Sequence, residues 1–187
     1  MRRRLRPALK PLRCLVAVLV ATLVLNLTLR AQTRLAPFVA TPSDVVDRML
    51  RLASVGPTDI VYDLGSGDGR IVIAAATMFG ARGVGIEIDP MLVERARANA
   101  AAAGVADRVT FRLEDAMTAD VSDATVVTLY LLAASNVKLR PHLQAQLRPG
   151  SRIVAHNFGM GDWEPQKVEN FRDQQGATRT LFLWTIR

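Results

Sequence analysis

The chain has few of the residues that bind metals or form disulfides. Its 187 residues include one cysteine, Cys14, and two histidines, His142 and His156. One cysteine cannot form a disulfide within the chain, and it cannot supply a cluster of thiolate ligands. Two histidines are few for a metal centre built from imidazole groups. We therefore predict no disulfide in the folded part of the chain and no metal site.

The chain also lacks an excess of positive charge outside its first 34 residues. The formal net charge is +7, but residues 1–34 contain eight Lys and Arg and no Asp or Glu. From Leu35 onward, 16 basic residues are balanced by 17 acidic ones, which leaves a net charge of −1. Proteins that track nucleic acid neutralise its phosphates with cationic surfaces. The distribution of charge therefore predicts no nucleic-acid partner for the domain.

Internal repeats and low-complexity tracts are absent as well. Half of the residues are hydrophobic and 22% are charged, a composition typical of a globular protein rather than a disordered one. A length of 187 residues suits one domain with a leader and is short for two domains. We predict three parts: a leader at 1–34, a connector with a helix at 35–56, and one domain at 57–187.

The leader combines positive charge with one long apolar run. Residues 1–13 are basic, and residues 14–29 are apolar apart from three polar residues. This order is typical of a secretory signal or of a signal-anchor that stays in the membrane. The run has 16 residues, slightly fewer than the about 17–25 that usually span a bilayer. Because no clean small-residue cleavage site follows, we favour an uncleaved membrane anchor at 14–29 over a cleaved signal.

Strand-like and helical patterns alternate through the domain. The apolar residues between Val45 and Leu52 recur at helical spacing, which predicts a helix in the connector. Apolar runs then alternate with helical segments, which predicts an α/β fold whose mostly parallel sheet is covered by helices on both faces. The expected strands are 59–64, 83–88, 108–113, 125–131 and 152–158, the expected helices are about 69–79, 90–104 and 135–147, and an antiparallel pair of strands is expected at 167–171 and 178–186.

The stretch VYDLGSGDGR, residues 61–70, contains three glycines directly after an expected strand. Gly65, Gly67 and Gly69 allow positive φ angles and a close approach to a ligand. In an open α/β sheet, such a loop lies at the carboxyl end of the strand, where ligands bind. The spacing differs from the G-x-G-x-x-G of dinucleotide sites, and Asp63 and Asp68 would repel phosphates. An acid before the turn favours a cationic ligand that carries an amino group and a sulfonium.

Two further acids follow the next two expected strands. Glu87 ends the second strand, 18 residues after Gly69, where it can accept hydrogen bonds from ribose hydroxyls. Asp115 follows the third strand, where it can accept a hydrogen bond from an adenine amine. Each acid alone is most often a solvated loop residue, and a glycine-rich turn alone is a weak signal. Taken together, they predict that S-adenosylmethionine is bound by Asp63, Gly65, Ser66, Gly67, Gly69, Glu87 and Asp115.

Four stretches of the chain resemble one family of enzymes. The segments PFVATPSDVVDRML, VYDLGSGDGRIVIAAA, GVGIEIDP and VVTLYLL lie between Pro37 and Leu132. They resemble class I S-adenosylmethionine-dependent methyltransferases, and more narrowly the lysine methyltransferases of the ATP synthase c-subunit and the adenine nucleotide translocase, with their bacterial relatives. The resemblance implies a Rossmann-like core after a hydrophobic helix, and methyl transfer to lysine in a protein substrate. The bacterial relatives carry a proline where this chain has Ala133 and an acid where it has Asn157.

The fourth expected strand supplies candidate catalytic residues on the substrate side. Thr128 and Tyr130 share one face of this strand because side chains alternate along it. Tyr130 lies near the carboxyl end of the strand, where it either hydrogen-bonds or encloses an incoming amine, or simply packs under a loop. A buried channel beside a sulfonium lowers the pKa of a lysine amine from its usual value of about 10.4, so a dedicated strong base is not required.

Three other segments are candidates that also have a purely structural explanation. His156 is placed to relay a proton, but a structural histidine held by hydrogen bonds is the favoured interpretation. Residues 161–163 form either a substrate lip or an anchoring turn with a half-buried tryptophan. Phe38, Thr41 and Pro42 are expected to fold over the cofactor, unless Phe38 simply packs against the first helix.

Three functions stay open at this point. The favoured one is a membrane-anchored protein-lysine N-methyltransferase that acts on a membrane-associated protein. The second is methylation of a small molecule or lipid at the membrane. The third is a non-catalytic assembly factor that binds the cofactor, because no acidic or Asn-Pro signature follows the fourth strand. The basic leader would send the domain outward, whereas the cofactor is made in the cytosol, so the side of the membrane also stays open.

Overall fold

The computed structural model describes residues 39–187, which form four helices and seven strands. The expected anchor at 14–29 and Phe38 lie outside the described residues. Within the part from 39 to 187, no helix is long and apolar enough to cross a bilayer. In chain order the elements are α2 (Ser43–Leu52), β1 (Ile60–Leu64), α3 (Arg70–Phe79), β2 (Arg82–Glu87), α4 (Pro90–Ala102), β3 (Val109–Leu113), β4 (Val126–Leu129), α5 (Ala133–Gln146), β5 (Arg152–His156), β6 (Lys167–Arg172) and β7 (Thr178–Thr185).

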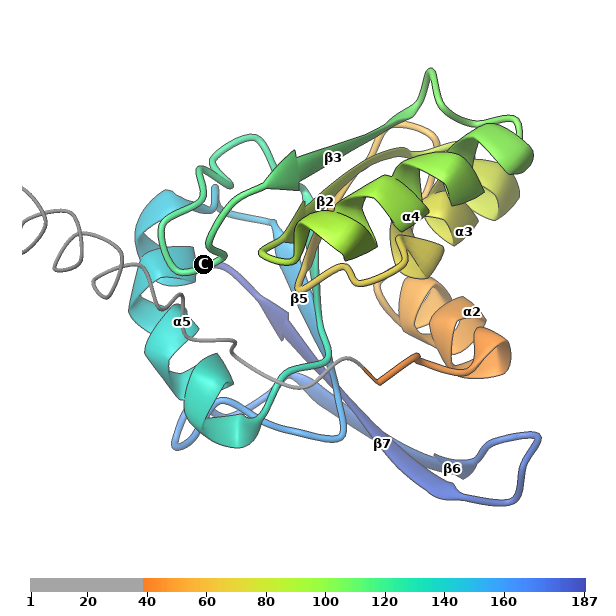
Figure 1. Cartoon of the computed structure of the whole chain (residues 1–187). Helices are drawn as coiled ribbons and strands as arrows, with labels where there is room; N and C mark the ends of the chain where they lie inside the picture. The colour runs from red at the N-terminus through yellow and green to blue at the C-terminus, as the bar shows by residue number, and fades with distance from the viewer. Residues whose placement is uncertain (1–38) are drawn as a thin grey trace, which may run out of the picture. The chain divides into compact units, whose positions relative to one another are not determined.

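The strands form one sheet in the order β3-β2-β1-β4-β5-β7-β6 (Figure 1). The five strands from β3 to β5 are parallel, and β7 runs antiparallel to both β5 and β6. This confirms the predicted α/β fold with a mostly parallel sheet and an antiparallel pair formed by its last two strands. The pairing of β7 with β5 was not predicted, and it places His156 opposite Leu181.

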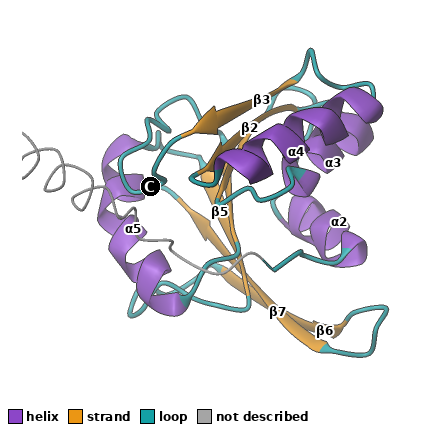
Figure 2. Cartoon of the chain, in the orientation of Figure 1, coloured by secondary structure: helices purple, strands orange, loops and turns teal. Residues whose placement is uncertain are grey.

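Helices cover both faces of the sheet (Figure 2). On one face, Tyr62 and Leu129 pack in a cluster with Leu139 of α5. On the other face, Val61 and Val126 pack with buried residues of α2 and α3. Adjacent residues of a strand therefore face different layers, as the two-residue period of a strand requires. Burial on both faces explains why these strands are almost continuously hydrophobic in sequence.

Two glycines in β2 allow the layers around the glycine loop to approach closely. A Cβ at Gly83 would lie 2.6 Å from the Cβ of Val72 in α3. A Cβ at Gly85 would lie 2.6 Å from both the Phe111 ring and the Oγ of Ser66. Real Cβ atoms do not approach other atoms this closely, so a larger residue would displace α3 or the loop. The loop after β1 therefore rests directly on β2.

The strand order reverses between β1 and β4. β1 pairs with β2 on one side and with β4 on the other. The helices that follow these two strands cover opposite faces, since α3 packs with one core cluster and α5 with another. In open α/β sheets, ligands bind at the carboxyl ends of the strands at such a reversal. The glycine loop and the connection after β4 both lie at this point.

β4 ends at Leu129, two residues earlier than predicted. The chain turns here because Leu131 packs on the glycine loop, where a Cβ at Gly65 would lie only 2.9 Å from its Cδ2. α5 then begins at Ala133, also two residues before its expected start. Tyr130 therefore belongs to the connection between β4 and α5 and not to the strand.

Candidate active site

The glycine loop, residues 65–69, turns sharply between β1 and α3. Its three glycines have positive φ angles of 83°, 55° and 81° in chain order. The first two N–H groups of the loop donate to the carbonyl of Ile86 and so tie the loop to β2. A Cβ at Gly69 would lie 2.5 Å from the Cζ of Phe111. Glycine is required here both for the backbone angle and for the space, because other residues rarely adopt positive φ.

Asp63 lies at the carboxyl end of β1 and is only 3% exposed. Burial raises the pKa of its carboxyl group to about 7, the hydrogen bond from Thr128 opposes this change, and the negative charges of Glu87 and Asp68 add to it. This carboxyl group is held far from water, and among residues 39–187 no cation contributes to its pKa. A positively charged ligand group would restore its ionised form. This agrees with the predicted binding of a cationic ligand.

Thr128 lies directly behind Asp63. Its side chain is fully buried, and its hydroxyl donates to Asp63 Oδ1 over 2.8 Å. The hydroxyl is thus directed at Asp63, and a catalytic role of Thr128 on the substrate side stays a prediction. We interpret Thr128 as a residue that orients the carboxyl group of Asp63.

Glu87 organises the backbone at the end of β2. Its Oε2 accepts a hydrogen bond from the Gly67 N–H over 2.8 Å. Its Oε1 accepts hydrogen bonds from the N–H groups of Ile88 and Asp89 over 2.8 and 3.0 Å. A carboxylate has about four acceptor positions, so roughly one stays free for a ligand hydroxyl. Glu87 thus fixes the glycine loop and also presents an acceptor at the site.

Asp68 forms an ion pair that fixes the connector beside the glycine loop. Arg70 Nη2 lies 2.6 Å from Asp68 Oδ2, and Arg70 Nε donates to Asp68 Oδ1 over 2.9 Å. These hydrogen bonds hold the pKa of Asp68 below its usual value, although burial opposes them. Arg70 Nη1 also donates to the backbone carbonyl of Thr41 over 2.8 Å. The connector with Thr41 and Pro42 is therefore held at the glycine loop, where it was expected to fold over the cofactor.

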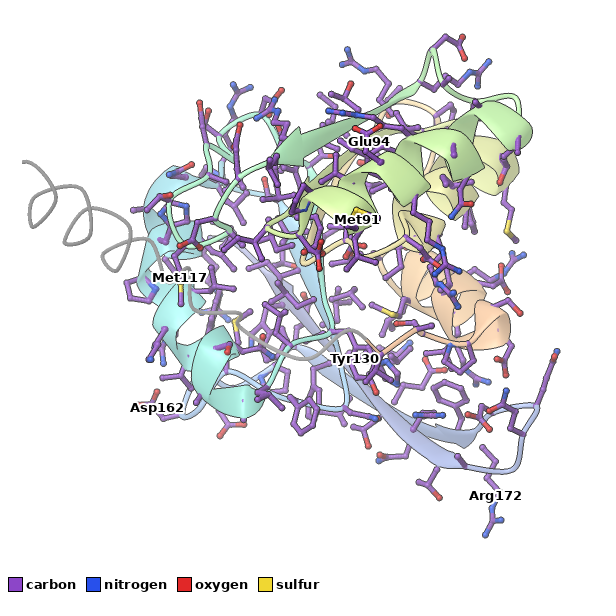
Figure 3. The ribbon with its side chains drawn as sticks, in the orientation of Figure 1. Met91, Glu94, Met117, Tyr130, Asp162 and Arg172 are labelled. Carbon is purple, nitrogen blue, oxygen red and sulfur yellow. The ribbon has the colours of Figure 1, made fainter. Side chains whose placement is uncertain are left out.

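Asp115 lies in the turn after β3. Its Oδ1 accepts a hydrogen bond from the Met117 N–H over 2.9 Å. Two large apolar side chains at this edge were not predicted from the sequence: Met91 is 77% exposed and Leu113 is 55% exposed. Leu113 of β3 pairs with Glu87 of β2. Met91 lies in the first turn of α4 (Figure 3). Met91 and Leu113 are therefore candidates for the apolar surface that contacts the adenine ring of the cofactor.

Tyr130 and His156 form a second group, at the carboxyl ends of β4 and β5. Their ring centroids lie 4.0 Å apart with an angle of 32° between the ring planes. His156 is fully buried, and neither ring nitrogen has a hydrogen-bond partner among the described residues. The favoured interpretation of His156 as a structural histidine held by hydrogen bonds is therefore wrong. Burial lowers its pKa to about 4, with a further contribution from Arg179 and an opposing one from Asp173.

Asn136 is a polar residue of this corner that no sequence pattern indicates. It lies in the first turn of α5, is fully buried, and donates from Nδ2 to the carbonyl of Phe158 over 2.9 Å. Its Oδ1 has no hydrogen-bond partner among the residues from 39 to 187. Its place after β4 was the only available signal, because no acid or Asn-Pro pair marks this segment.

The two departures from the family pattern have simple structural explanations. Ala133 is the first residue of α5, a position that accepts proline or alanine. Asn157 has a φ of 62°, which asparagine tolerates better than most residues. The Thr180 N–H donates to Asn157 Oδ1 over 3.1 Å, so Asn157 joins the end of β5 to β7.

Residues 161–163 form an anchoring turn, which is the structural alternative for this segment. A Cβ at Gly161 would lie 3.2 Å from Val137 of α5. Arg140 of α5 forms an ion pair with Asp162. Trp184 Nε1 donates to the carbonyl of Trp163 over 2.9 Å. These contacts hold the turn against α5 and β7.

The chain carries a recognisable family domain over most of this site. The family model for the ANTKMT methyltransferase domain matches residues 63–167. The chain belongs to this methyltransferase family. The match begins at Asp63 and runs to the first residue of β6, so it includes both groups of site residues. This confirms the resemblance and the assignment of the chain as an S-adenosylmethionine-dependent methyltransferase.

Relatives of this methyltransferase include archaeal and animal enzymes. A protein-lysine N-methyltransferase of Saccharolobus islandicus is 42% identical over 151 residues, which cover 80% of this chain and 93% of that protein. The adenine nucleotide translocase lysine N-methyltransferase of Mus musculus is 35% identical over 132 residues, 71% of this chain and 57% of that protein. Among solved structures, an RNA methyltransferase of Salinibacter ruber in complex with S-adenosyl-L-homocysteine is 60% identical, with a TM-score of 0.75 over 79% of this chain and 94% of that chain.

The cofactor of this methyltransferase is S-adenosylmethionine. The Salinibacter ruber structure contains S-adenosyl-L-homocysteine. The residues described above fit such a ligand, because a cation would restore the charge of the buried Asp63, Glu87 keeps an acceptor position, and the buried Ser66 Oγ has no hydrogen-bond partner in the described part of the chain. When bound, S-adenosylmethionine supplies a methyl group, and the electron pair of the broken carbon–sulfur bond stays on sulfur. Asp63, Glu87 and Asp115 would hold its charged and polar groups.

Proposed function

We propose that this methyltransferase modifies lysine side chains of a membrane-associated protein. The observation that carries the proposal is the 42% identity to the protein-lysine N-methyltransferase of Saccharolobus islandicus, over 93% of that protein. The mouse relative is also named as a lysine N-methyltransferase. Two relatives with the same printed activity and over 30% identity favour an amine on a protein as the methyl acceptor.

The geometry of the Tyr130 corner agrees with an amine substrate. The partly buried Tyr130 and the fully buried His156 form a wall beside the end of β4. An ammonium group that enters such a place loses its water shell, and burial lowers its pKa from about 10.4. The positive charge of the cofactor acts in the same direction. The amine can therefore lose its proton to water before it reacts.

The membrane part of the proposal depends on the leader. The apolar run at 14–29 follows a strongly basic segment, which is the pattern of an anchor. An anchor raises the effective concentration of the enzyme near substrates in the same membrane. We propose a single N-terminal anchor as the localisation of this enzyme. A topology reporter fused after Arg187 measures which side of the membrane the domain occupies.

Labelled cofactor tests the proposed substrate class. Membranes and soluble extract of the source cell are incubated with the full chain and methyl-labelled S-adenosylmethionine, and protein, lipid, small molecules and RNA are then separated. We expect the label in membrane protein, as methyllysine after hydrolysis. Label only in lipid or small molecules would support the second function, and cofactor binding without any label would support an assembly factor.

RNA methylation is a second candidate, and one observation favours it. The solved structure with 60% identity bears the name of an RNA methyltransferase. The net charge of −1 from Leu35 onward argues against it, since RNA binding needs an excess of cationic side chains on the binding surface. Label that ribonuclease releases from the RNA fraction would support RNA methylation and contradict lysine methylation.

A further inference from the structure

Three buried polar atoms without a partner belong to the corner formed by the ends of β4 and β5 and the first turn of α5. They are Asn136 Oδ1 and the two ring nitrogens of His156, and none has a hydrogen-bond partner within the described residues. Both side chains are fully buried. A buried polar atom without a partner costs free energy, so in a native protein it marks strain, a catalytic role, or a place where a bound water, ion or ligand supplies the missing bond. Three such atoms at the carboxyl ends of two neighbouring strands make this corner a candidate ligand site.

A backbone contact holds the Asn136 side chain beside the end of β5. Asn136 Nδ2 donates to the carbonyl of Phe158, and the Phe158 N–H donates to the carbonyl of His156 over 2.8 Å. The Asn136 amide is therefore fixed by its nitrogen end, which leaves the oxygen as the end without a partner. The Tyr130 ring packs against the His156 ring in a tilted arrangement, from the connection after β4. Asn136, His156 and Tyr130 thus come from three elements that meet at one place.

The corner offers hydrogen-bond acceptors and no net charge. His156 is uncharged at neutral pH because its pKa is about 4, and the charged groups that act on it are Arg179 of β7 and Asp173 after β6. A neutral imidazole has one N–H and one acceptor nitrogen. Arg179 and Asp173 are also paired with each other, with Nε and Oδ2 2.7 Å apart. A ligand in this corner therefore meets one acceptor from Asn136 and one from His156.

We propose that Asn136 Oδ1 and the acceptor nitrogen of His156 bind the two N–H bonds of the neutral target amine, with Tyr130 as the enclosing wall. The proposal rests on the proposed lysine substrate. A neutral primary amine has two N–H bonds and one lone pair. With both N–H bonds held, the lone pair is the part of the nitrogen left free to accept a methyl group. A hydroxyl or thiol substrate has one hydrogen and would leave one acceptor unpaired.

Two variants of Asn136 separate this role from a structural one. Asn136→Ala removes both the Phe158 contact and the acceptor, whereas Asn136→Asp loses the Phe158 donor but keeps an acceptor. We expect Asn136→Ala to lower kcat/KM for methylation of membrane protein about 10- to 100-fold, the range for an unpaired buried hydrogen-bonding group. Asn136→Asp should keep more activity than Asn136→Ala, because one of its carboxyl oxygens can still accept from the amine. Asn170→Ala, which alters an exposed asparagine of β6, is the matched control and should not change the rate.

Cofactor binding and the pattern of products complete this test. Calorimetry with S-adenosylhomocysteine should give the same Kd for all variants, because Asn136 lies outside the glycine loop. Mass spectrometry should show monomethyllysine formed faster than the higher forms in the wild type, because each methyl group removes one N–H bond. Equal loss of activity in Asn136→Ala and Asn136→Asp, with an unchanged product ratio, would overturn the proposal. If the wild-type enzyme methylates no lysine, the result contradicts the proposed function and not the role of Asn136.

A spectroscopic test does not require activity. The chain has two histidines, so nitrogen NMR of the imidazole groups gives two sets of signals, and His142 is an internal reference. We expect n-butylamine at pH 8, with S-adenosylhomocysteine present, to shift the acceptor nitrogen of His156 and not the signals of His142. The shift should weaken in Asn136→Ala. No shift of His156 at saturating n-butylamine would refute an amine site in this corner, whatever the substrate class.

Discussion

At the scale of single residues, Asp63 makes stability depend on pH. Its pKa in the folded protein is about 7, whereas an unfolded chain has a value near 3.8. The folded state therefore binds more protons than the unfolded state between these values, and stability falls as pH rises through this range. We expect the ligand-free wild type to melt at a lower temperature at pH 8 than at pH 5.

The variant Asp63→Asn should not lose stability as the pH rises, because an amide does not ionise. At pH 8 it should be more stable than the wild type, by up to about 4 kcal/mol for a change of three pKa units. Thermal melting of both proteins at pH 5 and pH 8 measures the difference. The exposed Asp107→Asn is the control and should follow the wild type. A pH dependence that persists in Asp63→Asn would contradict the assignment.

The same carboxyl group should make cofactor affinity depend on pH. Only its ionised form attracts a cationic ligand group, so the affinity of the wild type for S-adenosylmethionine should rise between pH 6 and pH 8. We expect Asp63→Asn to bind at least about 10-fold more weakly at pH 8, with a smaller difference at pH 6. Calorimetry at the two pH values measures this. A constant ratio of affinities would show that Asp63 does not titrate in the free enzyme.

At the scale of elements, the start of α3 depends on a glycine with two separate functions. Gly69 has a φ of 81°, and a Cβ there would lie 2.5 Å from Phe111. Gly104 has a φ of 70°, but no atom of residues 39–187 lies within 4 Å of its Cβ position. Gly69→Ala should cost about 2–4 kcal/mol of stability and Gly104→Ala only about 1 kcal/mol. Urea unfolding measures both, and adding Phe111→Leu to Gly69→Ala should restore part of the loss.

The ends of the elements show how far the sequence could predict the fold. Asp89 and Pro90 carry a local helix-start signal, and α4 begins at Pro90 with Asp89 Oδ1 accepting from the Met91 N–H. The end of β4 had no local signal, because it depends on the contact of Leu131 with Gly65. Periodicity predicts which residues are buried in a strand, but it does not say where a distant loop stops that strand.

The candidate site likewise contains residues that the sequence predicts and residues that it does not predict. The glycine loop and Glu87 could be predicted because their spacing along the chain is itself the signal. The hydrogen bond between Thr128 and Asp63 spans 65 residues, and the contact of Asn136 with Phe158 spans 22. No local pattern encodes such pairs, since they depend on which strands become neighbours. The partner-free nitrogens of His156 are visible only once all neighbours of the ring are in place.

At the scale of the whole molecule, charge and function are divided between two parts of the chain. Residues 1–34 carry all of the excess positive charge, while the site residues lie from Asp63 onward. We expect a chain that begins at Leu35 to bind S-adenosylhomocysteine as tightly as the full chain. It should leave the membrane fraction and methylate membrane protein about 10-fold more slowly or worse, because the effective concentration is lost. Calorimetry, fractionation and labelling measure these three effects, and membrane retention without the leader would contradict the proposed anchor.

Because β7 pairs with β5, the sheet beside the site is completed only late in synthesis. β5 leaves the ribosome before β7, so its outer edge has no partner until residues 181–185 have been made. The glycine loop and its neighbours β1, β2 and β4 are complete earlier. A nascent chain that ends between β5 and β7 therefore has an unpaired edge at β5. Such an edge is prone to pair with other chains. We therefore expect a chain truncated after His156 to aggregate more readily than the complete chain.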